Sequence, residues 1–169
     1  MIKFTAIHEA GHAVAHIRFN IEQYEATIVP SEGNRGSVTA EGENHVWSPE
    51  DAQNMVLAFC AGYAALVAAG WSRKTATRGA RNDFDRAEGL IEQWELDGAL
   101  EDWLQKAVAL MREPNNRRAV DLIAKELLER KTVPWLDLED LVRVADGELS
   151  EEEFADLKKL SELTQTPKP

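Results

Sequence analysis

One stretch constrains this chain more than any other, the pentapeptide His8-Glu9-Ala10-Gly11-His12. Residues four apart lie on the same face of an α-helix, so a helix here would present both imidazoles to a single metal ion. Glu9 would lie about 100° around the helix from His8. From there its carboxylate can take a proton from a water molecule activated by that ion. The alternative is an ordinary helix whose histidines bond to carbonyl groups or water.

The surrounding residues favour a buried helix over residues 3 to about 19. Nearly all of them are small or apolar: Ile7, Gly11, Val14 and the alanines at 6, 10, 13 and 15. A helix this buried must give each of its histidines a partner. His16 continues the four-residue spacing, but each step drifts about 40° around the helix, so we expect a packed or exposed histidine there. The third ligand must then come from another part of the chain.

Composition restricts the class of protein. A chain of 169 residues, 44% hydrophobic and 29% charged, is typical of a single globular domain. The net charge of −11 argues against nucleic acid and against anionic membrane surfaces, because both need basic patches. The chain has no run of 18 apolar residues, and one cysteine, Cys60, excludes an internal disulfide. We therefore expect a cytoplasmic protein in which Cys60 is an inert core thiol.

Residues 24 to 40 predict a small β-hairpin. The segment 24–29 alternates loosely, residues 31–34 are turn formers, and 35–40 resumes as a second strand. In zinc peptidases an exposed strand beside the metal helix binds the substrate backbone as an added strand. The alternative is a hairpin that only covers the core. His45 lies in the following loop, and we expect it at the surface.

The rest of the chain predicts helices. Four of them cover residues 48–69, 82–94, 99–111 and 115–128, the last with an asparagine cap at 115 or 116. A short helix capped by Asp137 follows. A final helix begins at the capping box Ser150-Glu151-Glu152-Glu153. This pattern predicts one mainly α domain over 1–147, followed by a C-terminal amphipathic helix and loose tail over 148–169. The last helix can close the core or dock on a partner.

Asp83 is the candidate for the third ligand. Counting back by four from the apolar Ala87 leads to Asp83, at the start of a helix. A carboxylate on a core-facing stripe needs a positive partner, which a metal ion held by two histidines would provide. The alternative is a first-turn acid stabilised by the helix dipole. Asp85 lies about 200° around the helix from Asp83 and should face solvent.

Residues 71 to 82 read as a locally basic loop in an acidic protein. Its cations are Arg73, Lys74, Arg78 and Arg81. Their nearness in sequence to Asp83 makes them candidates for stabilising an oxyanion. A solvated loop is the other interpretation.

Two motifs resemble the peptidase domain of the FtsH-type ATP-dependent zinc metalloproteases. His8-Glu9-Ala10-Gly11-His12-Ala13 is similar to that family's metal helix. Gly79-Ala80-Arg81-Asn82-Asp83, followed by Ala87, is similar to its second motif. The order and separation of the motifs agree too, and the likeness covers roughly residues 5 to 145.

This resemblance implies a helical metallopeptidase domain with a small ribbon beside the zinc helix. It implies zinc on His8, His12 and Asp83, with Glu9 as the general base and a peptide substrate along the 24–40 ribbon. The family is normally fused to a membrane anchor and a ring ATPase, and this sequence contains neither. We therefore expect an ATP-independent endopeptidase that takes unfolded or short polypeptides. A separate ATPase partner and a homo-oligomer both stay open.

The chain departs from the family in one helix. Where the family usually reads Gly-Gly-Arg-Ala-Ala-Glu-Glu, this chain reads AGYAALV over residues 61–67. Tyr63, Leu66 and Val67 thus replace the arginine and both glutamates. If those charges support the metal or the hexamer, a degenerate protein results: a non-catalytic module that binds zinc, peptides or a partner.

Overall fold

The computed structural model describes residues 2–30, 36–39 and 48–164. The chain is mainly helical with a small antiparallel sheet, as the sequence predicts. The helices are α1 (Ile2–Arg18), α2 (Pro49–Ala68), α3 (Arg73–Thr77), α4 (Arg81–Gln93), α5 (Leu100–Arg112), α6 (Pro114–Arg130), α7 (Trp135–Asp146) and α8 (Glu151–Thr164). The strands are β1 (Glu25–Thr27), β2 (Ser37–Thr39) and β3 (Thr132–Pro134).

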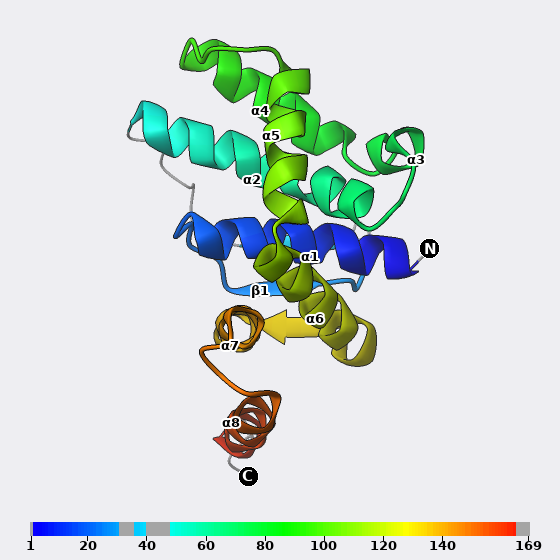
Figure 1. Cartoon of the computed structure of the whole chain (residues 1–169), viewed down its shortest axis with the longest axis vertical. Coiled ribbons are helices and arrows are strands. Elements are labelled where there is room, and N and C mark those ends of the chain that lie inside the picture. Colours follow the sequence, from blue (N-terminus) through cyan, green and yellow to red (C-terminus); the bar gives the residue numbers. More distant parts are fainter. Residues whose placement is uncertain (1, 31–35, 40–47, 165–169) are drawn as a thin grey trace.

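Helix α1 occupies the middle of the molecule, between α2 on one side and the sheet on the other (Figure 1). Its small residues allow α2 to come very close. A Cβ atom added to Gly11 would lie 2.5 Å from the carbonyl oxygen of Ala61 and 2.6 Å from Cβ of Ala65. The glycine inside the pentapeptide is therefore required by packing, because any side chain there would push the two helices apart.

Helix α2 is the longest of the described helices and packs against α1 and α5. Ser48 caps its start by accepting a hydrogen bond from the Asp51 backbone N–H, at 3.1 Å. It ends at Ala68, and Gly70 two residues later has a φ of +89°, which suits glycine and lets the Trp71 N–H donate to the Leu66 carbonyl. By length and composition it is the one helix of the described segments that could cross a membrane. Yet 61% of its most apolar 18-residue stretch is buried inside this structure, as expected for a core helix.

The predicted hairpin is present, and a third strand joins it. The strand order is β2-β1-β3, with Ala26 opposite Val38 on one side and Val133 on the other. Strand β3 was not predicted, because its three residues, which end in Pro134, show no alternation of polar and apolar side chains. Since β1 is central, a further strand could add only at the outer edge of β2 or of β3.

The predicted loop over residues 71–82 is wrong in part, because it contains α3. Ser72 begins this short helix by accepting a hydrogen bond from the Thr75 N–H, at 3.2 Å. Ala76 is fully buried and anchors the turn on the core.

Two predicted helix caps are also wrong, because their side chains have distant partners. Helix α6 begins at Pro114 without an asparagine cap. Asn116 is buried and instead accepts a hydrogen bond from Arg18 Nε, at 2.7 Å. Helix α7 begins at Trp135, and Asp137 lies buried in its first turn, paired with Arg130 of α6.

The last helix begins with the predicted capping box. The Glu153 N–H donates to Ser150 Oγ at 3.1 Å, and the Ser150 N–H donates to the Glu153 carboxylate at 2.8 Å. Phe154 is buried against the core, and Lys158 Nζ donates to Glu126 of α6 at 2.8 Å. Helix α8 therefore docks on the rest of this chain. The predicted tail from residue 165 onward lies outside the described residues.

Candidate metal centre

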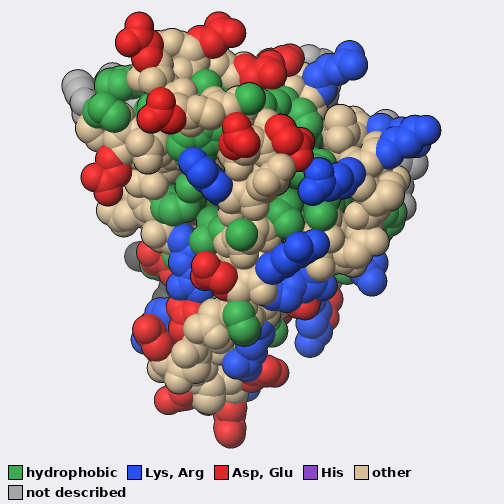
Figure 2. All heavy atoms as spheres, turned by 45° about the horizontal axis from the view of Figure 1, so that its top comes forward, with side chains coloured by type: hydrophobic (Ala, Val, Ile, Leu, Met, Phe, Trp, Pro, Cys, Tyr) green, Lys and Arg blue, Asp and Glu red, His purple; other side chains and the backbone are tan. Residues whose placement is uncertain are grey.

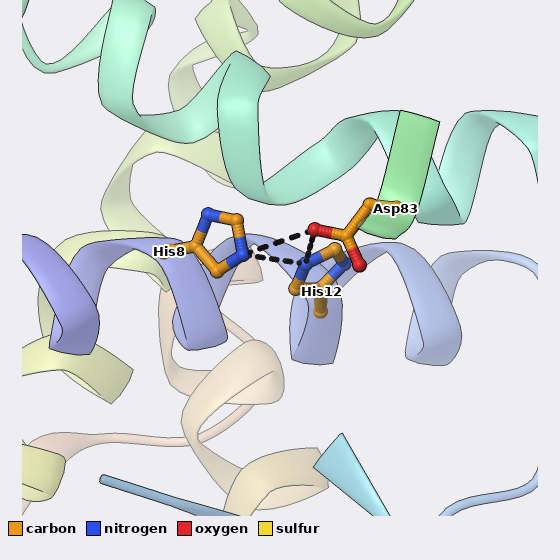
Figure 3. Close-up of side chains that lie close together, drawn as sticks. All are labelled: His8, His12 and Asp83. Atoms are coloured by element: carbon orange, nitrogen blue, oxygen red, sulfur yellow. Dashed lines mark hydrogen bonds and ion pairs between the residues drawn. The ribbon is translucent and has the colours of Figure 1, made fainter. Parts of the chain in front are cut away.

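His8, His12 and Asp83 converge although Asp83 is 71 positions along the chain from His12. Both imidazoles project from α1, and the carboxylate reaches them from the first turn of α4 (Figure 3). The Nε2 atoms of the two histidines lie 3.1 Å apart. Oδ2 of Asp83 lies 3.3 Å from Nε2 of His8 and 3.5 Å from Nε2 of His12. Three potential ligand atoms therefore form a nearly equilateral triangle.

The size of this triangle suits a metal ion. Ligand bonds of about 2.0–2.1 Å in a tetrahedral site put neighbouring ligand atoms about 3.3 Å apart. The three observed separations of 3.1, 3.3 and 3.5 Å bracket that value. Among the residues that the structure describes, this is the one group of three or more His, Cys, Asp or Glu side chains that can hold a metal ion.

His12 is oriented by the backbone of α2. Its Nδ1 lies 2.8 Å from the carbonyl oxygen of Ala58, which can only accept, so Nδ1 carries the proton. This hydrogen bond leaves the Nε2 lone pair of His12 pointing into the triangle. The Nδ1 atom of His8, in contrast, is buried without a hydrogen-bond partner in the described structure. Packing must therefore orient the His8 ring.

Gly62 of α2 forms the floor beneath the two imidazoles. A Cβ atom at this position would lie 2.5 Å from Nε2 of His12 and 2.5 Å from Cε1 of His8. Those separations are well inside van der Waals contact, so a side chain at position 62 would displace both rings. Gly62 was not predicted as a site residue. Its signals in the sequence are that it is a glycine within an otherwise apolar helix and that it matches the second glycine of the family segment compared with residues 61–67.

Glu9 is buried, with 6% of its surface exposed. Its side chain lies against the backbone just before β2, where a Cβ atom on Gly36 would be 2.7 Å from Glu9 Oε1. Burial raises the pKa of Glu9, while the charges of His12 and His8 oppose this shift and that of Asp83 adds to it. Glu9 is therefore a more basic carboxylate than usual, within electrostatic range of all three members of the triangle.

The triangle is built to hold positive charge. Burial acts to lower the pKa of His12, but its hydrogen bond to Asp83 and the charge of Asp83 raise that pKa to about 9. Burial likewise acts to raise the pKa of Asp83, but hydrogen bonds from His12 and His8 hold it well below its usual range. The cluster therefore stabilises one positive charge at its centre, which a proton or a metal ion can supply.

His16 does not join the group. It is buried, and burial followed by the nearby charge of His12 lowers its pKa to about 4. It is therefore a neutral, packed histidine, in agreement with the sequence analysis. Cys60 is also a core residue, and burial raises the pKa of its thiol to about 12.

The remaining predicted positions lie around the group. Asp85 is exposed, as predicted, and so are the cations of the basic segment: Arg73, Lys74, Arg78 and Arg81. Arg73 pairs with Glu101 at 2.9 Å. None of these cations has a described interaction with the triangle. His45 lies outside the described residues.

The three departures from the family pattern make the α2 face near the site apolar. Leu66 is fully buried one turn after Gly62, and Val67 is partly buried. Tyr63 is buried with its ring 5.5 Å from that of Phe84. No charged side chain from these positions supports the histidines.

Comparison of the sequence with models of known protein families gave no match, and comparison with curated proteins gave none.

Proposed function

We propose that this chain is a zinc-dependent endopeptidase, related to the peptidase domain of the FtsH-type metalloproteases, that hydrolyses unfolded or short polypeptides. One observation carries the proposal: the triangle of His8, His12 and Asp83 has the dimensions of a metal site and lies within electrostatic range of the buried Glu9.

The donor set favours zinc over other divalent ions. Two imidazoles and one carboxylate are typical ligands of catalytic zinc, and three protein ligands leave a position for a water molecule or substrate. Calcium and magnesium prefer all-oxygen sites. When bound, zinc supplies a Lewis acid that polarises a carbonyl group and lowers the pKa of water to about 7.

The chain's own residues supply the base and the substrate platform. Glu9 takes a proton from the attacking water and passes it to the amine that leaves when the peptide bond breaks. Its raised pKa brings it closer to neutral pH, where proton transfer in both directions is efficient. Gly36, just before β2, lies against Glu9, so an extended peptide added along this strand would pass beside the base. Strand addition requires an unfolded or short substrate.

A second candidate is a non-catalytic module that binds a metal ion or a peptide. Two observations favour it. Nδ1 of His8 has no described partner, and Leu66 is an apolar residue where the family has a glutamate. Metal-ligating histidines normally donate this second N–H, and removing such a partner lowers metal affinity by about 10–100-fold. Such a module would keep the ligands without turning over a substrate.

Metal analysis and peptide cleavage together separate the two functions. Purified wild type should contain one zinc per chain by mass spectrometry and should cleave casein or a quenched fluorescent peptide. Glu9→Gln should keep the zinc and lose about 100- to 10,000-fold in rate, the usual value of a general base. Glu88→Gln, an exposed substitution of the same kind on α4, is the matched control and should cleave at the wild-type rate.

Each outcome is decisive. Cleavage that survives Glu9→Gln contradicts the mechanism. Stoichiometric zinc without cleavage by wild type supports the non-catalytic module instead.

A further inference from the structure

An aromatic surface runs from the metal centre to solvent. Phe4 lies one helical turn before His8 on the same face of α1, and their rings are almost parallel, with centroids 6.5 Å apart and an interplanar angle of 8°. Trp71 meets Phe4 edge-on, with centroids 5.4 Å apart. Trp71 is 37% exposed. The aromatic contacts thus extend from a potential metal ligand to the protein surface.

Gly79 lets the backbone before α4 pack directly against the Phe4 ring. A Cβ atom there would be 2.9 Å from Cε1 of that ring. Gly79 lies between α3 and α4, four residues before Asp83. We call Phe4, Trp71 and Gly79 the aromatic ledge. Phe4 lies beside His8, and Trp71 and Gly79 belong to the segment that leads to Asp83.

Exposed cations lie close in sequence to Trp71 and Gly79 of the aromatic ledge. Lys74, Arg78 and Arg81 are exposed, and no ion pair involves them within the described segments. Arg78 is the direct neighbour of Gly79. Figure 2 shows Lys and Arg side chains on the right of the view, the side on which α3 lies in Figure 1, and Asp and Glu side chains mainly along its top and left. A local excess of positive charge in a chain of net charge −11 favours an acidic ligand here.

We propose that the aromatic ledge is a specificity site that accepts a large apolar side chain of a peptide, next to the bond held at the metal centre, with an acidic residue beside it in the peptide. The inference rests on the proposed peptidase function, because it takes the peptide as the occupant. The ledge is continuous with the metal centre through the Phe4–His8 contact. Exposed tryptophan flanked by arginine is also the composition typical of strong binding spots.

Peptide binding tests the ledge independently of catalysis. Fluorescein-labelled decapeptides with a central Phe-Asp, Ala-Asp or Phe-Asn pair are titrated into zinc-loaded Glu9→Gln protein, and anisotropy gives the Kd. We expect the Phe-Asp peptide to bind about tenfold more tightly than the Ala-Asp peptide, as for one large apolar group in a site. Trp71→Ala should reduce that ratio to about one. Trp71→Phe should keep most of it, which controls for misfolding.

A distant exposed apolar residue gives the matched control. Leu160 on α8 is 61% exposed, and Leu160→Ala should leave the binding ratio at the wild-type value. Arg78→Gln should remove the preference for Phe-Asp over Phe-Asn while keeping the preference for Phe-Asp over Ala-Asp. Added salt should weaken the first preference and leave the second.

The outcomes separate this inference from the proposed function. Equal binding of the Phe-Asp and Ala-Asp peptides, or a ratio unchanged by Trp71→Ala, overturns the ledge. If wild type also cleaves these peptides without preference, the peptidase stands and the ledge alone fails. Selective binding of Phe-Asp without any cleavage by wild type upholds the ledge and contradicts the peptidase.

Discussion

Two buried polar clusters of this molecule differ in how their charges are balanced. Where α6, α7 and α8 meet, Asp137 pairs with Arg130, and Glu126 pairs with Lys158 at 2.8 Å and Arg130 at 3.6 Å. Every acid there has a permanent cation. In the triangle of His8, His12 and Asp83, the only groups that can carry a positive charge are imidazoles whose nitrogen atoms converge on the same carboxylate oxygen.

The difference separates a structural cluster from a group that can hold a metal ion. A buried ion-pair network that is complete within the chain needs nothing from outside. Converging nitrogen and oxygen lone pairs repel one another unless a proton or a metal ion lies between them. A divalent cation would therefore stabilise the triangle, whereas the charges of the α6–α8 cluster are already balanced.

The largest effect should come from filling the floor of the triangle. Gly62→Ala puts a Cβ atom 2.5 Å from Nε2 of His12, so both imidazoles must move. We expect zinc affinity to fall by more than about 100-fold, beyond the loss from a missing supporting hydrogen bond. Isothermal titration of the metal-free protein with zinc measures this.

A second glycine on a helix controls for the substitution itself. A Cβ atom at Gly89 of α4 meets no atom within 4 Å. Gly89→Ala should therefore bind zinc as wild type does and gain about 0.5–1 kcal/mol of stability from helix propensity. Normal zinc binding by Gly62→Ala would show that the triangle is not the metal site.

Next in size is the effect of displacing Glu9, the proposed general base, while leaving the triangle intact. Gly36→Ala puts a Cβ atom 2.7 Å from Glu9 Oε1. Cleavage should fall by about 100-fold or more, the value of a misplaced general base. Zinc titration should give the wild-type affinity. Loss of zinc together with activity would instead mean that Gly36 supports the metal-binding triangle rather than the base.

Removing one acid from the complete cluster should affect stability and not metal binding. Asp137→Ala leaves Arg130 without its closest partner, which costs about 3 kcal/mol for a buried pair. The urea midpoint should fall, and zinc affinity should stay at the wild-type value. Asp83→Ala should show the opposite pattern. The comparison fails if both substitutions change the same property.

The smallest effect is on the pH dependence of stability, through His16, a buried imidazole with no carboxylate of the described structure beside it to stabilise its charged form. The folded-state pKa of His16 is about 4, below the ordinary value of 6.5. The unfolded state therefore binds more protons between these values, and stability falls as the pH drops through 6.5 toward 4. From pH 7 to pH 5 this single group should remove about 2 kcal/mol.

Urea unfolding in EDTA at pH 7 and pH 5 measures this loss. The pH dependence should be smaller by the same amount in His16→Gln, which cannot titrate. The pKa of His12 is shifted in the opposite direction, because the hydrogen bond to Asp83 and the charge of Asp83 raise it. An unchanged pH dependence in His16→Gln would mean that His16 does not titrate as its burial requires.

Much of the candidate site could be predicted from local spacing. The four-residue interval puts His8 and His12 on one face of α1, and the interval from Asp83 to Ala87 directs the carboxylate inward. The mainly helical fold, the hairpin and the capping box of α8 also follow from short-range patterns. Such patterns determine which residues share a face, because helix and strand geometry repeats within a few residues.

Only the tertiary structure decided which faces meet and how closely. The contacts of Gly62 with the two imidazoles and of Gly36 with Glu9 join residues from different elements, and neither glycine has a side chain to reveal them. The pairing of β3 with β1 and the distant partners of Asn116 and Asp137 were hidden for the same reason. Separations between backbones depend on how the whole core packs, and a short-range pattern does not contain that information.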